Sequence, residues 1–134
     1  MIQPLFVFSD WALLILRLVL GVIMLVHGLP KIKDLKANGQ NFVAIGFKPG
    51  MFWGTIAALV EFVGGIALIA GFFTQIVAIF IFIQFLVVIF KVDLEKGFVD
   101  GYEYPLLIAA AALILATMGG GIYNLDSYLD ISIY

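Results

Sequence analysis

The longest apolar run of the sequence is Leu13-Leu-Ile-Leu-Arg17-Leu-Val-Leu-Gly21-Val-Ile-Met-Leu-Val-His27-Gly28-Leu-Pro-Lys31. As a helix it is long enough to cross a bilayer, because about 20 apolar residues span the hydrocarbon core. It nevertheless carries Arg17 in its first half and ends near His27, the only histidine of the chain. A charged side chain at the centre of a membrane helix costs about 3 kcal/mol on insertion scales. Arg17 therefore needs a partner elsewhere in the sequence.

The composition of this 134-residue chain is that of an integral membrane protein. Apolar residues make up 64% of the sequence and charged residues 12%, against about 25% charged in soluble domains. The mean hydropathy is +1.19. We predict an all-α fold, a four-helix transmembrane bundle in one membrane domain (residues 1–134), with a short interfacial segment between the first two helices. The predicted helices run over about 11–29, 51–71, 74–91 and 102–118.

Residues 31–50 form the longest predicted loop. Pro30 is expected to close the first helix, and the apolar but short segment 41–47 is expected to be interfacial or re-entrant. All basic residues except Arg17 lie in this loop or in the third loop. By the positive-inside rule we predict a multi-pass protein of the cell membrane whose first and third loops are cytoplasmic and whose termini are outside.

The sequence contains no cysteine and a single histidine. This excludes disulfides and thiolate metal sites within the chain, and it argues against a haem or an iron–sulfur cluster. We therefore predict no metal, haem or flavin. The lipid bilayer is the predicted partner, and nothing in the sequence indicates nucleic acid.

The first two predicted helices carry matching faces of small and ionisable residues. The faces are Arg17, Gly21, Met24, Gly28 and Lys31 on the first helix, and Gly54, Ala57, Ala58, Glu61, Gly64 and Gly65 on the second. Small residues let two membrane helices approach closely. At about 1.5 Å per residue, the expected depths of Arg17 and Glu61 differ by about one turn. We predict an Arg17–Glu61 ion pair.

A second polar cluster is expected at the opposite end of the first helix. His27 and Lys31 end that helix on the side where Glu103 begins the fourth, and Gln84 is a polar residue within the third. Ionisable groups within a membrane are functional by default. The catalytic candidates are Arg17, Glu61, His27 and Glu103, and the substrate-binding candidates are Arg17, Lys31 and Gln84.

Each candidate also has a structural alternative that the sequence leaves open. Arg17 and Glu61 can form an ion pair that only holds two helices together. His27 can face lipid headgroups, and Lys31 can extend to the interface. The remaining two are Gln84, which can bond to a neighbouring helix, and Glu103, which can complement a helix dipole.

Several motifs recur in a fixed order along the chain. They are Arg17, Gly21, His27-Gly28, Lys31, Gly46-Phe-Lys-Pro49, Glu61-x-x-Gly64-Gly65-x-x-Leu68-x-x-Gly71-x-x-Thr74, Glu103, and Gly119-x-Gly121-x-x-x-Leu125-Asp126. This pattern, from about residue 13 to 129, resembles the DoxX family of small four-helix membrane proteins. Two departures are Gln75, where that family often has a basic residue, and Asn124, where it commonly has Ser. Any role that this basic residue has in the family therefore cannot be assigned to this chain.

The resemblance implies a membrane oxidoreductase subunit, because the DoxX family includes the membrane subunit of thiosulfate:quinone oxidoreductase. The candidate residues would then donate hydrogen bonds or protons to a quinone, and Arg17 would hold a small sulfur oxyanion such as thiosulfate. The implied partners are a second oxidoreductase subunit and a further copy of the chain. Whether the chain alone is an enzyme stays open, because it has no redox-active residue of its own.

Two functions of other classes remain open. A carrier could couple proton binding at a membrane-embedded glutamate to substrate exchange, although no inverted repeat is visible in the sequence. A scaffold subunit would use the polar pair only to fix helix packing.

Overall fold

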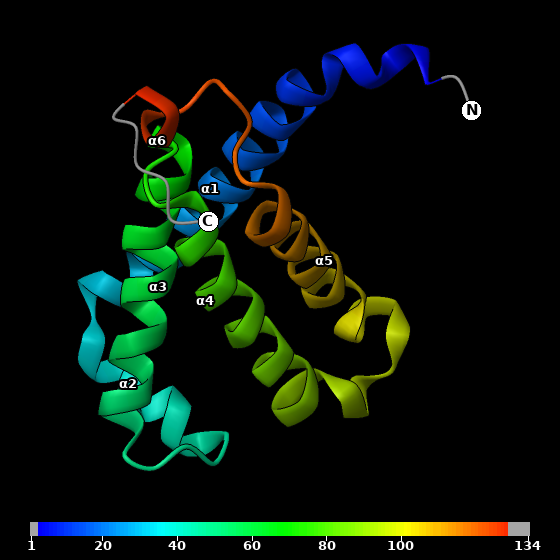
Figure 1. Ribbon diagram of the computed structural model, residues 1–134. Helices are drawn as coiled ribbons and strands as arrows, with labels where there is room; N and C mark the ends of the chain where they lie inside the picture. The colour runs from blue at the N-terminus through cyan, green and yellow to red at the C-terminus, as the bar shows by residue number, and fades with distance from the viewer. Residues whose placement is uncertain (1–2, 129–134) are drawn as a thin grey trace.

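The computed structural model describes residues 3–128, and every regular element in that range is a helix (Figure 1). Four helical stretches are long and apolar enough to cross a membrane, namely Pro4–Lys33, Gly50–Ala70, Thr74–Lys96 and Phe98–Met118. The predicted all-α fold with four spans is therefore confirmed. The predicted cytoplasmic and external sides stay a prediction.

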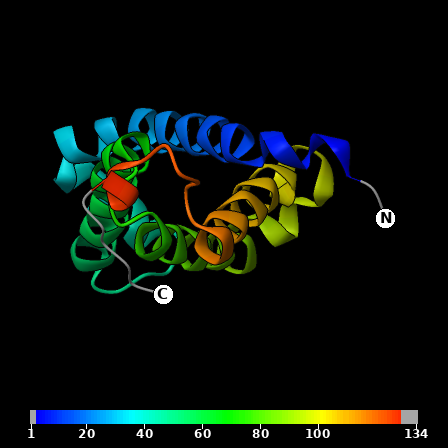
Figure 2. The same ribbon diagram turned by 45° about the horizontal axis from the view of Figure 1, so that its top comes forward.

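The elements follow one another with short connections. In chain order they are η1 (Pro4–Phe8), α1 (Ser9–Lys33), α2 (Leu35–Ala44), α3 (Gly50–Ala70), α4 (Thr74–Val88), η2 (Ile89–Asp93), η3 (Leu94–Lys96), η4 (Phe98–Tyr102), α5 (Glu103–Met118) and α6 (Leu125–Tyr128). Figures 1 and 2 show α2 beside α3, and α4 between α3 and α5. We call the end with α2 and η2–η4 the loop end, and the end with α6 the tail end.

Helix α1 is longer than the sequence analysis predicted. It continues through Pro30 to Lys33, so the expectation that Pro30 closes the helix is wrong. Proline removes one intrahelical hydrogen bond, but the Asp34 N–H still donates to the Pro30 carbonyl at 3.2 Å. The extra turn carries Lys31 along the helix axis toward the loop end.

Helix α2 occupies half of the predicted loop. The interfacial segment was expected at 41–47, whereas the helix begins at Leu35 because Asp34 caps it, its carboxylate accepting a hydrogen bond from the Ala37 N–H at 3.0 Å. The buried Asn38 side chain donates to the Gly54 carbonyl at 2.7 Å. This bond fixes α2 against the start of α3.

Glycines bring the backbones of α1 and α3 into direct contact, as the small-residue faces predicted. A Cβ atom on Gly28 would lie 2.5 Å from the Phe62 nitrogen, and one on Gly65 would lie 2.6 Å from the Leu25 nitrogen. The two backbones could not approach so closely if side chains stood between them.

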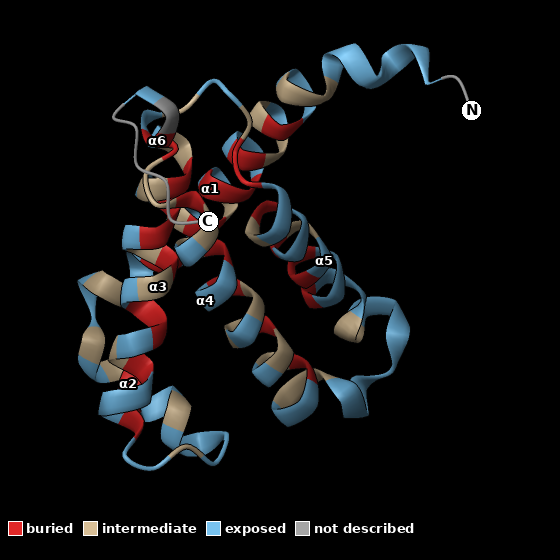
Figure 3. Cartoon of the chain, viewed as in Figure 1, coloured by how far each residue is buried: buried red, intermediate tan, exposed pale blue. Residues whose placement is uncertain are grey.

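The core is shared by all four spans. Its largest fully buried apolar side chains are Leu20, Met24, Leu68, Ile81 and Leu115. Figure 3 shows buried positions on the facing sides of the helices and exposed positions on their outer sides. The exposed residues include many large apolar ones, as expected for a surface that faces lipid.

Helices α3 and α4 meet at the tail end and diverge toward the loop end (Figure 1). At their junction, Gly71 has a left-handed backbone with φ of 75°, a conformation that glycine adopts without steric cost. From this tight turn, α4 leans toward α5. The space between the diverging halves of α3 and α4 is where the candidate site lies.

Candidate functional site

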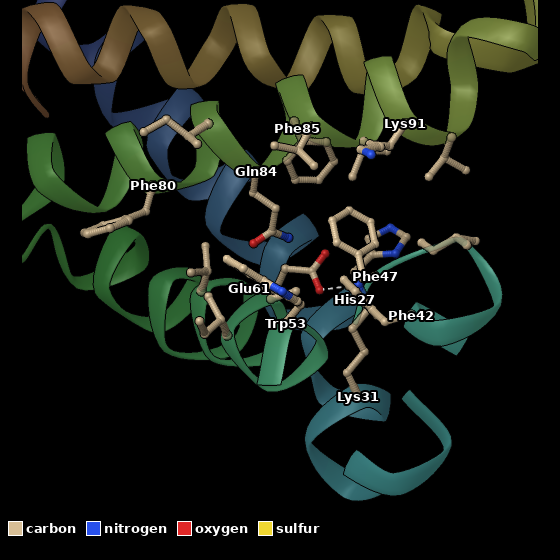
Figure 4. Close-up of a pocket in the computed structure, with 18 of the residues that line it drawn as sticks. His27, Lys31, Phe42, Phe47, Trp53, Glu61, Phe80, Gln84, Phe85 and Lys91 are labelled. Atoms are coloured by element: carbon tan, nitrogen blue, oxygen red, sulfur yellow. Dashed lines mark ion pairs between the residues drawn. The ribbon is translucent and has the colours of Figure 1, made fainter. Parts of the chain in front are cut away.

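A cavity of about 660 Å³ lies between α3 and α4, with α1, α2 and the start of α5 completing its wall. Its lining is mostly aliphatic and aromatic. The polar side chains that reach it are His27, Lys31, Lys48, Glu61, Gln84, Lys91 and Tyr104. Four of the residues predicted from the sequence as site residues therefore line the same cavity (Figure 4).

Glu61 and Lys31 form an ion pair at the wall of the cavity, with Oε2 and Nζ 2.5 Å apart (Figure 4). The register of α1 on α3 explains this pair. Gly28 packs on the backbone of Glu61, and Lys31 lies one turn further along α1. Because helical side chains tilt toward the helix N-terminus, the Lys31 side chain bends back to the level of Glu61.

His27 and Tyr104 join α1 to α5 beside this ion pair. The Tyr104 hydroxyl lies 3.3 Å from the His27 Nε2, and either group can be the donor, depending on the histidine tautomer. The two ring centroids are 6.2 Å apart. This contact joins α1 and α5 at the wall of the cavity.

Gln84 reaches the cavity from α4, the helix opposite Glu61. Figure 4 shows its amide pointing into the cavity, toward the Glu61 carboxylate. An amide offers two N–H donors and a carbonyl acceptor. Together with Lys31 and Glu61, it gives the cavity donors and acceptors from both sides.

The predicted Arg17–Glu61 ion pair is wrong. Arg17 Nη1 instead donates to the Gly120 carbonyl at 3.0 Å, at the tail end of the bundle. Since Gly28 is level with Glu61, Arg17 lies about 16 Å further along α1 at about 1.5 Å per residue. The expected depth was incorrect because it assumed that α1 ends level with the start of α3, whereas Gly28, near the end of α1, lies beside Glu61, eleven residues after the start of α3.

The chain beyond α5 turns back toward Arg17. Asp126 interacts electrostatically with its guanidinium. The Asp126 carboxylate also accepts hydrogen bonds from the Phe73 and Thr74 N–H groups, at 2.6 and 2.9 Å. It thereby caps the N-terminus of α4. Arg17 does not line the cavity that brings the other candidates together.

Glu103 does not join the cluster predicted for it with His27 and Lys31. It is exposed, does not line the cavity, and has no ion pair within residues 3–128. Tyr104 takes that place, since neighbouring side chains on a helix point about 100° apart. Tyr104 is not among the site residues predicted from the sequence.

Comparisons with known proteins agree with this architecture. A family model described as DoxX matches residues 12–94. The chain is 29% identical over 116 residues to "Putative oxidoreductase CatD" of Bacillus subtilis (strain 168), which covers 87% of this chain and 85% of that protein. It is 29% identical over 126 residues to "Inner membrane protein YqjF" of Escherichia coli (strain K12), covering 91% and 95%. No solved structure matches the chain. Because the family model covers more than half of its length, the chain is a membrane protein that belongs to the DoxX family.

Proposed function

We propose that this protein is the membrane subunit of an oxidoreductase and that its cavity binds the headgroup of a quinone. The observation that carries this proposal is the ion pair of the buried Glu61 with Lys31 at the wall of a largely apolar cavity of about 660 Å³. Small-molecule sites have this character, an apolar space of about 300–1,000 Å³ with a few convergent polar groups. The name of the Bacillus subtilis relative, "Putative oxidoreductase CatD", supports the proposal that this protein belongs to an oxidoreductase.

The cavity lining matches the chemistry of a quinone. A quinone headgroup is a flat apolar ring with two carbonyl oxygens that accept hydrogen bonds. Trp53 and Phe85 provide ring-shaped apolar surface, while the Gln84 amide and the Lys31 ammonium group provide donors. These donors reach the cavity from opposite helices, as two carbonyl oxygens on opposite sides of one ring require.

Reduction of the quinone needs protons as well as electrons. Each carbonyl oxygen takes up one proton when the quinone becomes a quinol. Glu61 lies within the cavity, while His27 is exposed and hydrogen-bonded to Tyr104. We assign proton uptake from the surface to His27 and proton delivery inside the cavity to Glu61.

The electrons come from a donor bound beside the quinone or from a second subunit, because the chain has no cysteine and no other redox-active side chain. We propose a small sulfur oxyanion as the donor: two thiosulfate ions that join through a new S–S bond to form tetrathionate release the two electrons that the quinone takes up. Lys48 and Lys91 line the loop end of the cavity and are both exposed. Clustered cations raise the local concentration of a small anion. Arg17, the oxyanion ligand expected from the sequence, is bonded to Gly120 at the other end.

The chain's two tryptophans allow a direct binding test. Trp53 lines the cavity, whereas Trp11 stacks on Tyr123 at 4.6 Å between ring centroids and lies outside it. Trp11→Phe and Trp53→Phe each leave one fluorescent reporter. Both variants, in lipid nanodiscs, would be titrated with a short-tailed quinone, which quenches tryptophan fluorescence on contact.

We expect saturable quenching in the Trp11→Phe protein, where Trp53 remains, and loss of this saturation when Glu61→Gln is added. The Trp53→Phe protein should show only the linear quenching caused by quinone dissolved in the bilayer. Equal titration curves for the two single-tryptophan proteins would contradict the proposal. In that case, substrate-dependent proton flux in liposomes would favour a carrier.

A further inference from the structure

A second hollow adjoins the cavity and is entirely apolar. It has a volume of about 330 Å³ and lies between α3 and α4. We call it the α3–α4 groove, and its lining is Leu59, Val60, Val63, Gly64, Val77 and Phe80. Val60 and Phe80 line the cavity as well. The groove therefore continues the cavity toward the tail end of the two helices.

The chemistry of the lining changes steadily along this path. Lys48 and Lys91 stand at the loop end of the cavity, and Glu61 faces Gln84 in its middle. Past Phe80, no polar side chain lines the α3–α4 groove. A continuous space that is cationic at one end, hydrogen-bonding in the middle and apolar at the other end matches an amphiphile with a long apolar tail.

The α3–α4 groove opens toward the lipid-facing surface, and its floor lacks a side chain at Gly64. Gly64 forms part of the floor, and a Cβ atom there would meet only Val77 Cγ1 at 3.2 Å and Ile81 Cδ1 at 3.9 Å. Val63 and Phe80, on the two flanking helices, are 54% and 56% exposed. A chain lying in the groove would thus leave the protein directly into the hydrocarbon region of the bilayer.

We infer that the ligand of the cavity is a long-tailed, lipid-soluble quinone and that its isoprenoid tail leaves the protein through the α3–α4 groove. This inference rests on the proposed function, which supplies the headgroup, and adds the substrate class and its orientation. The opposite orientation would place the apolar tail against Lys48 and Lys91, and desolvating charged groups without a polar partner is costly.

The groove would determine whether a ligand with a long tail can enter the cavity, rather than how strongly the tail is attracted. Lipid tails are as apolar as the groove, so a ligand tail gains little hydrophobic free energy by moving between them. The tail must nevertheless have a free path if the headgroup is to reach Glu61. Blocking the groove should therefore exclude long-tailed quinones and leave the binding of short-tailed ones unchanged.

The test compares two phenylalanine substitutions on the exposed side of α3. Val63→Phe adds a ring within the α3–α4 groove, whereas Ile66→Phe adds the same ring at a residue that is 48% exposed and lines neither the groove nor the cavity. Both are made in the Trp11→Phe protein, so Trp53 reports binding. Each protein is titrated in nanodiscs with a short-tailed and a long-tailed quinone of the same headgroup. Gly64→Val fills the groove floor and serves as a second blocking variant.

We expect Val63→Phe and Gly64→Val to weaken binding of the long-tailed quinone by about tenfold or more, which is about 1.4 kcal/mol, and to leave short-tailed binding unchanged. Ile66→Phe should match the parent for both ligands. If short-tailed binding persists and all three variants bind the long-tailed quinone like the parent, the tail inference is wrong while the proposed function stands. If neither quinone saturates Trp53 quenching in the parent, the proposed function fails and the inference fails with it.

Discussion

Lys31 and Glu61 are joined at 2.5 Å but differ in their access to water. The Glu61 side chain is 5% exposed and the Lys31 side chain 31% exposed. A lone charge that remains buried is far more costly than one that can move to the surface. The two halves of this ion pair are therefore not equivalent, and removing either one should have a different effect on stability.

We expect Lys31→Met to destabilise the fold more than Glu61→Gln. The first substitution leaves a buried carboxylate without its partner, whereas the second leaves an ammonium group that can reach the surface. The difference in the free energy of unfolding should be about 1–3 kcal/mol, measured by denaturant unfolding in detergent micelles. The double variant should recover part of the loss of Lys31→Met. Equal losses for the two single variants would show that burial does not control the pair.

Tyr104→Phe should weaken quinone binding without unfolding the protein. The substitution removes the hydroxyl that lies 3.3 Å from His27 and keeps the ring. Because Tyr104 lines the cavity, a hydrogen bond from its hydroxyl to the quinone would contribute about 0.5–1.5 kcal/mol, so the affinity reported by Trp53 quenching should fall several-fold. Tyr102→Phe removes a hydroxyl from a residue that does not line the cavity, and it should behave like the parent. A quinone affinity unchanged by Tyr104→Phe would exclude Tyr104 from the site.

Arg17→Gln should destabilise the bundle and leave quinone binding intact. Arg17 is 3% exposed and holds the Gly120 carbonyl near Asp126. Breaking a buried charged contact of this kind costs about 2–4 kcal/mol, which a thermal melt in detergent would detect. Gln75→Ala also removes a hydrogen bond to the end of α5, but no charge, and should cost less.

The same variant tests the alternative role of Arg17 as a substrate ligand. If Arg17→Gln melted at the parent temperature but lost the Trp53 quenching, Arg17 would belong to the ligand site. Its position would then have to change upon binding.

Gly28→Ala should be much more disruptive than Gly64→Ala. A Cβ atom on Gly28 would lie 2.5 Å from the Phe62 nitrogen, which is backbone and cannot move aside. On Gly64 the nearest atom is a Val77 methyl group at 3.2 Å. Overpacking typically costs about 1–3 kcal/mol, and we expect that loss for Gly28→Ala, with under about 1 kcal/mol for Gly64→Ala. Similar melting temperatures for the two variants would mean that α1 and α3 are not in backbone contact.

The lysine distribution predicts the orientation in the membrane. Lys31, Lys33, Lys36 and Lys48 flank or lie in the first loop, and Lys91 and Lys96 lie at the third, so the loop end should face the cytoplasm. Reporters fused to either terminus should read as external. A cytoplasmic reading at both termini would invert the orientation, and the cationic end of the cavity would then open on the outer side.

The spans and the α1–α3 contact could be predicted from the sequence because they depend on local patterns. Apolar runs of spanning length mark the helices, and glycines repeating along one face mark a close helix contact. Glu61, Lys31, His27 and Gln84 were found because polar residues inside apolar runs are conspicuous. They line one cavity because the helices that carry them, α1, α3 and α4, are neighbours in the bundle.

The partners of these residues could not be predicted because they depend on helix ends. The end of α1 is not level with the start of α3, since Gly28 lies beside Glu61 well inside α3, and Lys31 rather than Arg17 is therefore the partner of Glu61. Tyr104 was missed for a different reason. On a soluble helix the polar face shows which side is outside, but on α5 both sides are apolar, and that contrast is absent.

The most direct measurement of the central proposal is photolabelling with a short-tailed quinone that carries a photoreactive group. The protein in nanodiscs would be irradiated, digested and mapped by mass spectrometry. The proposal predicts labels on cavity-lining segments, around 53–61 of α3 and 80–92 of α4 and η2, and their loss when excess unmodified quinone competes. Labels spread over lipid-facing positions such as Val19 and Leu107, and unaffected by the competitor, would contradict it.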